Sequence, residues 1–267
     1  MTTDSLEELS RINNELVNLQ RELSKKNQLL ERLNQQKNAF LGMAAHDLRN
    51  PISSVGGYAR LLLEVDVGAD ERRHALESIG RVADHMLILV NDLLDVSVIE
   101  SGKLELRREP VDLAKLLGER LQFFRLLARK KEITLDEEID GLTLRLDPGR
   151  TVQVIDNLVS NAVKYSPQDT RIQVSLRAGE QGSASLVVRD DGPGISAEEQ
   201  TRLFGAFERL SSRPTGGEKS SGLGLAICKE LIDLHNGEIG VRNNEGPGAT
   251  FWFRLPAAPV APGEGDE

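Results

Sequence analysis

The stretch Leu186-Val-Val-Arg-Asp-Asp-Gly-Pro-Gly-Ile195 decides between two ways of folding the second half of the chain. Its apolar residues predict a strand that ends at Asp190 and Asp191, and Gly192 and Gly194 then allow a tight turn. Glycines after a strand are also found in dinucleotide-binding sheets, where strands and helices alternate. The elements of this chain do not alternate regularly, so we predict a two-layer α+β sandwich and not a doubly wound sheet.

The two carboxylates at this turn also favour a particular ligand contact. In a dinucleotide-binding loop, Asp190 and Asp191 would lie close to a pyrophosphate and repel it. A carboxylate is better matched to a hydrogen-bond donor, such as the exocyclic amine of adenine.

The segments on either side supply the remaining elements of the predicted sandwich, which covers residues 111–256. Apolar residues that alternate with polar ones indicate half-buried strands, and apolar residues at helical spacing indicate helices. Strands are expected over residues 172–176, 185–188 and 250–255, and helices over 112–131, 149–164, 197–209 and 223–235. The segment 257–267, rich in Pro, Gly and acidic residues, indicates a disordered tail.

The first half of the chain shows only helical patterns. Leucines recur every seven residues from Leu9 to Leu30, and a second apolar series fills the other seam position. This spacing is the signature of a left-handed coiled coil. A single surface helix of a monomer is the alternative, but this segment has no other apolar face to bury. We therefore predict a coiled-coil signalling helix over residues 1–39 and a homodimer.

A helical hairpin is expected to follow over residues 40–102. The helical pattern continues to about Glu64, is interrupted at residues 66–70, and resumes until Ser101-Gly102. Two such hairpins, paired by the coiled coil, would form a four-helix bundle. Residues 103–110 are expected to link the hairpin to the sandwich.

Composition excludes several classes of protein. The formal net charge of −9 argues against a nucleic-acid binder, so a phosphate ligand must be held locally by backbone amides, a metal and a few side chains. The single cysteine, Cys228, allows no internal disulfide and fits a reducing, cytoplasmic compartment. No stretch approaches the roughly 20 apolar residues of a membrane span. A sensor, if there is one, is expected upstream or on a partner.

His46 is the first candidate for chemistry. It lies outside the apolar seam and should face solvent, where a neutral imidazole is a good nucleophile for phosphorus. Asp47 could accept a hydrogen bond from one ring nitrogen and leave the other free to attack. Asn50 lies one turn further on the same face, before Pro51. An ordinary exposed histidine beside a proline is the competing interpretation.

A second candidate is the polar face of the helix over residues 149–164. Asn157, Asn161 and Lys164 follow at intervals of four and three residues, opposite the apolar face. Solvated faces usually carry Glu and Lys, because Asn is a poor helix former. Amide oxygens bind hard cations and lysine neutralises phosphate, so this face suits a phosphate–Mg²⁺ site.

A glycine-rich stretch, residues 216–225, leads into the last predicted helix. Glycines let backbone N–H groups approach a phosphate at a helix N-terminus. The Gly-Lys-Ser/Thr ending of a Walker A loop is absent, as are the loops of serine, threonine and tyrosine kinases.

Together these stretches resemble the sensor histidine kinases of two-component systems, with their GHKL-type ATP-binding domain. The resemblance covers the chain from about Phe40 to Pro256, and its motifs occur in order at family spacing. His46-Asp-Leu-Arg-Asn-Pro resembles the H box, Asn157-Leu-Val-Ser-Asn161-Ala-Val-Lys164-Tyr165 the N box, Asp190-Asp-Gly192-Pro-Gly194 the first glycine box, Leu203-Phe204-Gly-Ala-Phe207 the F box, Gly222-Leu223-Gly224 the second glycine box, and Gly246-Pro-Gly-Ala-Thr250-Phe the closing strand motif.

The resemblance implies the activity of the chain. The protein would autophosphorylate His46 from Mg-ATP, with Asp47 as the orienting base, and pass the phosphoryl group to an aspartate of a response-regulator receiver domain. Asn50 stands where the family places a residue that positions water for dephosphorylation of the partner.

The resemblance also implies the nucleotide contacts. Asn161 would bind Mg²⁺ with support from Asn157, Asp190 would read adenine, and residues 211–221 would form a lid over ATP. Further nucleotide contacts would come from Lys164, Tyr165, Gly192, Gly194, Gly222, Leu223 and Gly224.

The sequence departs from the family pattern at two positions. Asp191 replaces a common Asn, and Ser220 replaces a common Gly, which could alter contacts of the lid.

Two rival functions are considered. One rival is an ATP-driven conformational machine like the gyrase and mismatch-repair ATPases, but these use a Glu base where this chain has Asn157. The other rival is an inactive dimeric scaffold, which would be expected to lose His46, Asn161 or Asp190.

Overall fold

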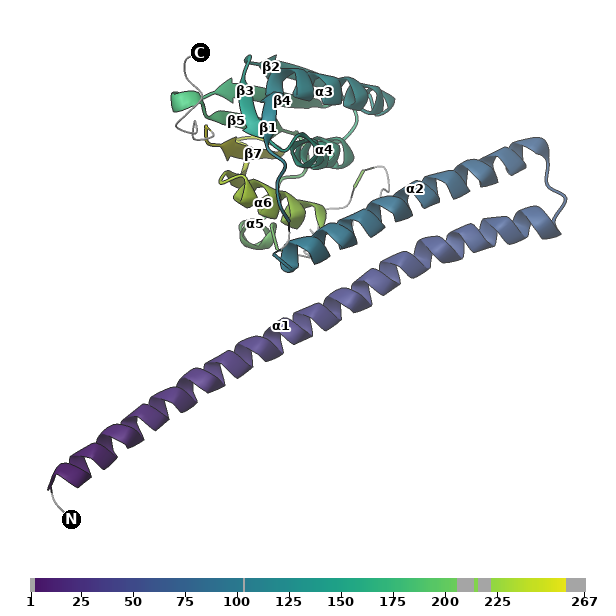
Figure 1. Cartoon of the computed structure of the whole chain (residues 1–267). Coiled ribbons are helices and arrows are strands. Elements are labelled where there is room, and N and C mark those ends of the chain that lie inside the picture. Colours follow the sequence, from purple (N-terminus) through teal and green to yellow (C-terminus); the bar gives the residue numbers. More distant parts are fainter. Residues whose placement is uncertain (1–2, 103, 206–213, 216–221, 258–267) are drawn as a thin grey trace. The chain divides into compact units, whose positions relative to one another are not determined.

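A computed structural model describes residues 3–102, 104–205, 214–215 and 222–257 (Figure 1). The chain divides into two compact units, Met1–Leu87 and Ile88–Glu267. Within the described residues, no helix is long and apolar enough to cross a membrane.

The first unit is built from two long helices. α1 (Thr3–Glu64) runs without a break through Pro51, and α2 (Ala69–Glu100) begins after a short loop and continues into the second unit. Five large apolar side chains of the predicted seam on α1 are more than half exposed in the single chain, which agrees with a face that a second copy would cover. The coiled coil and the homodimer stay predictions. The exposed seam residues are Ile12, Leu16, Leu19, Leu23 and Leu30.

The second unit contains a mixed five-stranded sheet of order β2-β4-β5-β7-β6. β2 pairs with β4 in parallel, and all other neighbours are antiparallel. A separate two-stranded ribbon joins β1 to β3. The strands are β1 (Glu109–Asp112), β2 (Thr134–Ile139), β3 (Thr143–Leu146), β4 (Arg171–Ala178), β5 (Ala184–Arg189), β6 (Glu238–Asn243) and β7 (Ala249–Leu255).

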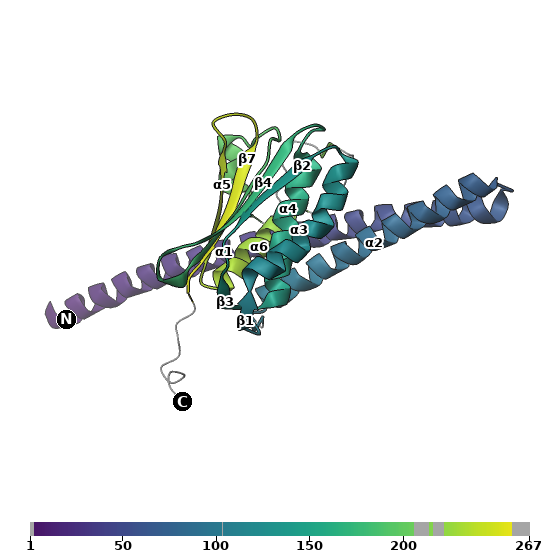
Figure 2. The same ribbon diagram turned by 90° about the horizontal axis from the view of Figure 1, so that it is seen from above.

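Three helices cover one face of this sheet, as Figure 2 shows. They are α3 (Leu113–Lys130), α4 (Pro148–Tyr165) and α6 (Gly224–Leu234). Their apolar faces meet the inward residues of the strands, and Leu121, Ile155, Leu186, Leu231 and Phe253 are fully buried in this core. Cys228 is also buried there, and burial raises the pKa of its thiol, so it fills space and does not act as a nucleophile. The predicted two-layer sandwich is confirmed.

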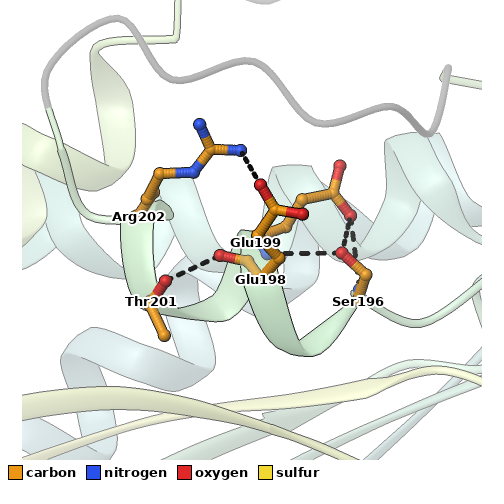
Figure 3. A network of polar contacts seen from close by, with 5 residues as sticks. All are labelled: Ser196, Glu198, Glu199, Thr201 and Arg202. Carbon is orange, nitrogen blue, oxygen red and sulfur yellow. Dashed lines mark hydrogen bonds and ion pairs between the residues drawn. The ribbon is translucent and has the colours of Figure 1, made fainter.

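The prediction of a helix over residues 197–209 is wrong at its end. α5 (Ala197–Arg202) is short, although a capping box between Ser196 and Glu199 starts it well (Figure 3). The Thr201 hydroxyl donates to the Glu198 carbonyl, and the Arg202 guanidinium donates to the Glu198 carboxylate. Gly205 N–H donates to the Arg202 carbonyl at 2.7 Å, which closes a turn and ends the helical pattern. Residues 206–209, and the predicted tail beyond residue 257, lie outside the described residues.

A buried histidine joins the linker to two helices of the sandwich. His235 Nδ1 donates to the Leu231 carbonyl at 2.7 Å, so Nε2 carries the lone pair that accepts from Asp147 N–H at 3.1 Å. The Asp147 carboxylate accepts from Arg150 N–H at the start of α4 and from Arg107 N–H in the linker. These bonds require a neutral His235, which explains why a histidine without a motif is buried.

We expect this histidine to make the sandwich sensitive to acid. Burial lowers the pKa of His235 in the folded protein, whereas the unfolded value is about 6.5. Its contribution to stability is therefore complete above pH 6.5 and is lost as the pH falls toward the folded pKa. Between pH 7.5 and pH 5.5, the wild type should lose about 1 kcal/mol more stability than His235→Gln.

Urea unfolding followed through Trp252, the single tryptophan of the chain and part of β7, measures this difference. Equal loss of stability in both proteins over this range would contradict the assigned role of His235.

Candidate functional site

The predicted nucleophile lies on α1, in the first unit. The His46 side chain is 67 % exposed, and its Nδ1 lies 3.3 Å from Asp47 Oδ1. A carboxylate can only accept, so this contact places the ring proton on Nδ1 and the lone pair on Nε2. Asn50 is exposed on the next turn, and Pro51 after it supplies no amide hydrogen to the helix.

The amide face of α4 is organised by a hydrogen bond between its two asparagines. Asn161 Nδ2 donates to Asn157 Oδ1 at 3.0 Å. Asn161 Oδ1 is thereby the oxygen that can bind a cation. The amide of Asn157 packs against Gly224, where an added Cβ would lie 1.9 Å from Asn157 Nδ2. The first residue of α6, Gly224, must therefore lack a side chain to leave room for the Asn157 amide.

Asp190 follows the last residue of β5 and is buried, with 5 % of its surface exposed. Its Oδ1 accepts from Gly192 N–H at 2.8 Å and from Ala249 N–H at 3.2 Å. Burial raises the pKa of Asp190, and Asp191 adds to the rise, whereas the two backbone hydrogen bonds oppose it. Because both amides contact Oδ1, Oδ2 is the oxygen available to a ligand.

Glycines allow the backbone to approach this carboxylate. A Cβ at Gly192 would lie 2.8 Å from Asp190 Oδ1 and 3.2 Å from the Tyr165 carbonyl. At Gly248, with φ of +90°, a Cβ would lie 1.9 Å from the Asp190 carbonyl oxygen. Gly192 thus joins the end of α4 to the end of β5, and Gly248 brings the β6–β7 turn onto the same place.

Asp191 has a structural contact. Its Oδ2 accepts from Arg171 N–H at 3.2 Å, at the first residue of β4. This bond gives the Asp191 side chain a structural role at the start of β4.

The base of the predicted lid is fixed to the end of α4. Thr215 N–H donates to the Lys164 carbonyl at 2.9 Å, and Thr215 Oγ1 donates to the Ser166 carbonyl at 3.0 Å. Lys131 Nζ lies 3.2 Å from Thr215 Oγ1 and donates to the Val163 carbonyl at 3.1 Å. Lys131 was not predicted from sequence. Phe207, Ser220 and the lid residues 211–213 and 216–221 lie outside the described residues.

The second unit therefore brings together most of the predicted nucleotide residues. Direct contacts join α4 to Gly192 and Gly224, and Leu223 is buried directly before Gly224. Gly222 and Gly194 adopt φ of +71° and +74°, as their turns require. His46, Asp47 and Asn50 lie in the other unit.

The residues present fit Mg-ATP better than a metal alone. Among the described residues, no group of three or more His, Cys, Asp or Glu side chains could hold a metal. Mg²⁺ commonly uses one or two protein oxygens and completes its shell with water and nucleotide phosphates. The single amide oxygen of Asn161 suits that arrangement.

Comparison with known proteins identifies both halves of the chain. Residues 36–102 match the His Kinase A (phospho-acceptor) domain. Residues 146–259 match the histidine kinase-, DNA gyrase B- and HSP90-like ATPase family.

Individual relatives give the same assignment. The circadian input-output histidine kinase CikA of Synechococcus elongatus is 36 % identical over 236 residues, which are 85 % of this chain and 31 % of CikA. The crystal structure of full-length ShkA in complex with AMPPNP is 31 % identical, with a TM-score of 0.61, and covers 84 % of this chain and 47 % of ShkA. The structure of the histidine kinase ThkA in complex with the response regulator protein TrrA is 27 % identical, with a TM-score of 0.61, and covers 80 % of this chain and 60 % of that one.

The chain spans between a quarter and a third of the length of the curated relatives it matches. A gyrase-like machine would share the second domain but not the first. Because a phosphoacceptor hairpin precedes the ATPase domain, and His46 lies inside it, this chain belongs to the sensor histidine kinases of two-component signal transduction.

Proposed function

We propose that the chain is a kinase core that binds Mg-ATP, phosphorylates its own His46 and transfers the phosphoryl group to an aspartate of a response regulator. The proposal rests on two sites, one in each unit, in which hydrogen bonds already orient the side chain proposed to act. His46 has its tautomer set by Asp47, and Asp190 has one carboxylate oxygen bound and the other available.

At the nucleophile, the lone pair on His46 Nε2 attacks the γ-phosphorus. The new N–P bond forms as the bond from phosphorus to the bridging oxygen breaks, and ADP leaves. The imidazole gains positive charge in this step, and the adjacent Asp47 carboxylate stabilises it. Most of the remaining acceleration comes from alignment and from neutralising phosphate charge.

In the nucleotide site, the hydrogen bonds of Asp190 and of the two asparagines of α4 support their proposed roles. Asp190 Oδ2 accepts from the exocyclic amine of adenine. Asn161 Oδ1 would hold Mg²⁺, which would neutralise phosphate charge, while Asn157 keeps the Asn161 amide in place. Backbone amides at the start of α6 approach the phosphates. Lys164 and Tyr165 contact the nucleotide phosphates or ribose, and further nucleotide contacts come from Gly192, Gly194, Gly222, Leu223 and Gly224.

Partners and organisation follow from the same resemblance. The similar kinase ThkA forms a complex with the response regulator protein TrrA, which supports a response regulator as the partner. Its receiver domain would dock over His46. The coiled coil 1–39 would pair two hairpins (40–102) and connect them to an upstream sensor domain or sensor partner. The chain itself would lie in the cytoplasm. The linker 103–110 would then carry the ATP-binding domain 111–256.

The two rival functions have less support. An ATP-driven machine needs a base to activate water, and Asn157 holds the amide of Asn161 and cannot take a proton. An inactive scaffold would not be expected to keep His46, Asn161 and Asp190 together with their supporting contacts.

Replacing the nucleophile should abolish autophosphorylation. His46→Gln removes the attacking nitrogen, so incubation with γ-labelled ATP should leave it unlabelled while ATP binding is retained. The wild-type label should be acid-labile and alkali-stable, as a phosphohistidine is. His74→Gln is the matched control, because His74 is an exposed histidine on α2 of the same unit. Undiminished labelling of His46→Gln would refute the assignment.

Asn50 should affect a different activity. An asparagine amide can orient a water but cannot take its proton, and transfer to His46 needs no such water. Asn50→Ala should therefore keep autophosphorylation and phosphotransfer, but slow dephosphorylation of a phosphorylated receiver by about 10- to 100-fold.

The measurement mixes a phosphorylated cognate receiver with ADP and either the wild type or the variant. Asn34→Ala, which changes another exposed asparagine of α1, serves as the control. Equal decay with all three proteins, faster than decay of the receiver alone, would show that dephosphorylation does not depend on Asn50.

A further inference from the structure

Two adjacent asparagines outside the family motifs bind both ends of the loop that follows β5. Asn243, the last residue of β6, contacts Ile195 twice: its Oδ1 accepts from Ile195 N–H at 2.9 Å, and its Nδ2 donates to the Ile195 carbonyl at 2.8 Å. Asn244 Nδ2 donates to the Asp190 carbonyl at 2.8 Å. The loop from Asp190 to Ile195 is thus held at its first and its last residue.

Asn244 is itself fixed within the turn between β6 and β7. Its Oδ1 accepts from Thr250 Oγ1 at 2.6 Å, and its Nδ2 also donates to the Pro247 carbonyl at 2.9 Å. Its backbone N–H donates to the Gly248 carbonyl at 3.1 Å. The donor that meets Asp190 is therefore held in one orientation by three other bonds.

The same turn also holds the carboxylate. Ala249 N–H donates to Asp190 Oδ1, and Asp190 N–H donates to the Ala249 carbonyl at 2.9 Å. Asp190 is consequently bound at its amide, its carbonyl and its side chain by residues 244–249. Between the two ends of the loop lie Gly192 and Gly194, which would otherwise give this segment large backbone freedom.

We infer that Asn243 and Asn244 are positioning residues for the nucleotide site. They fix the loop that presents Asp190 Oδ2 already in the nucleotide-free protein. Nucleotide binding therefore does not have to supply the free energy of ordering this loop. This inference rests on the proposed role of Asp190 as the group that reads adenine.

A purely structural role would give a different result. Residues that only stabilise the fold lower the free energy of unfolding but leave the affinity of the folded protein unchanged. Positioning residues change that affinity, and they change the local opening of the loop even without nucleotide. The amide of Gly192, whose hydrogen bond to Asp190 Oδ1 lies inside the loop, reports this opening.

The experiment compares Asn243→Ala and Asn244→Ala with the wild type in the full chain. Each variant should bind Mg-ATP about tenfold more weakly by calorimetry. This is the effect expected when the loop loses two hydrogen bonds, with Asn243→Ala, or one, with Asn244→Ala. KM for ATP should rise by a similar factor, with kcat at saturating ATP unchanged. Gly192 N–H should exchange with solvent faster in both nucleotide-free variants. Asn244→Asp, which keeps the acceptor for Thr250 but not the donor for Asp190, replaces Asn244→Ala if the latter does not fold.

Asp140→Ala is the matched control. The Asp140 carboxylate accepts from Ala178 N–H at 3.1 Å and pairs with Arg177, at the end of β4 remote from Asp191. It should lower stability without changing the affinity for ATP or the exchange of Gly192.

The outcomes separate the inference from the proposed function. Unchanged ATP affinity and unchanged Gly192 exchange in the asparagine variants would overturn the inference. Absence of ATP binding by the wild type would instead contradict the proposed function, and Gly192 exchange would still decide whether the two asparagines fix the loop.

Discussion

The hydrogen bonds from Gly192 and Ala249 to the buried carboxylate of Asp190 are the constraint on which the nucleotide site depends. A buried acid is costly unless it is hydrogen-bonded. Satisfying it here requires a tight turn after β5 and a partner strand, β7, that begins beside it. Gly192 and Gly248 are needed because any side chain at these positions would collide with Asp190. α4 packs against β5, and Gly192 lies between the end of α4 and the carboxylate.

The side chains proposed to act are oriented in different ways in the two halves of the chain. His46 is oriented by its immediate neighbour on one helix, so its geometry is local to a few residues of α1. The nucleotide site instead depends on contacts between segments far apart in the sequence, such as Asn157 with Gly224. In the proposed site, a chain of net charge −9 would still bind a polyanion, because backbone amides and a bound cation would provide the local positive charge.

Sequence patterns predicted the parts of the fold that are set locally. The strand ending at Asp190, the amide face of α4 and the hairpin helices all have a clear period. The strands β1 and β3 are four residues long, and β2 and β6 do not alternate cleanly in burial, so none of these was predicted. Asn243 and Asn244 were missed because their partners lie about fifty residues away. The contact of Asp191 with Arg171 was missed because it too joins separate segments of the chain, at a separation of twenty residues.

Base recognition by Asp190 is tested most directly by comparing ATP with inosine triphosphate, in which a keto oxygen replaces the amine. The wild-type protein should bind ATP about 10- to 100-fold more tightly, because its carboxylate would face an acceptor in the inosine nucleotide. Asp190→Asn, whose amide can donate to the keto oxygen, should lose this preference. Equal affinity of the wild type for the two nucleotides would contradict the account.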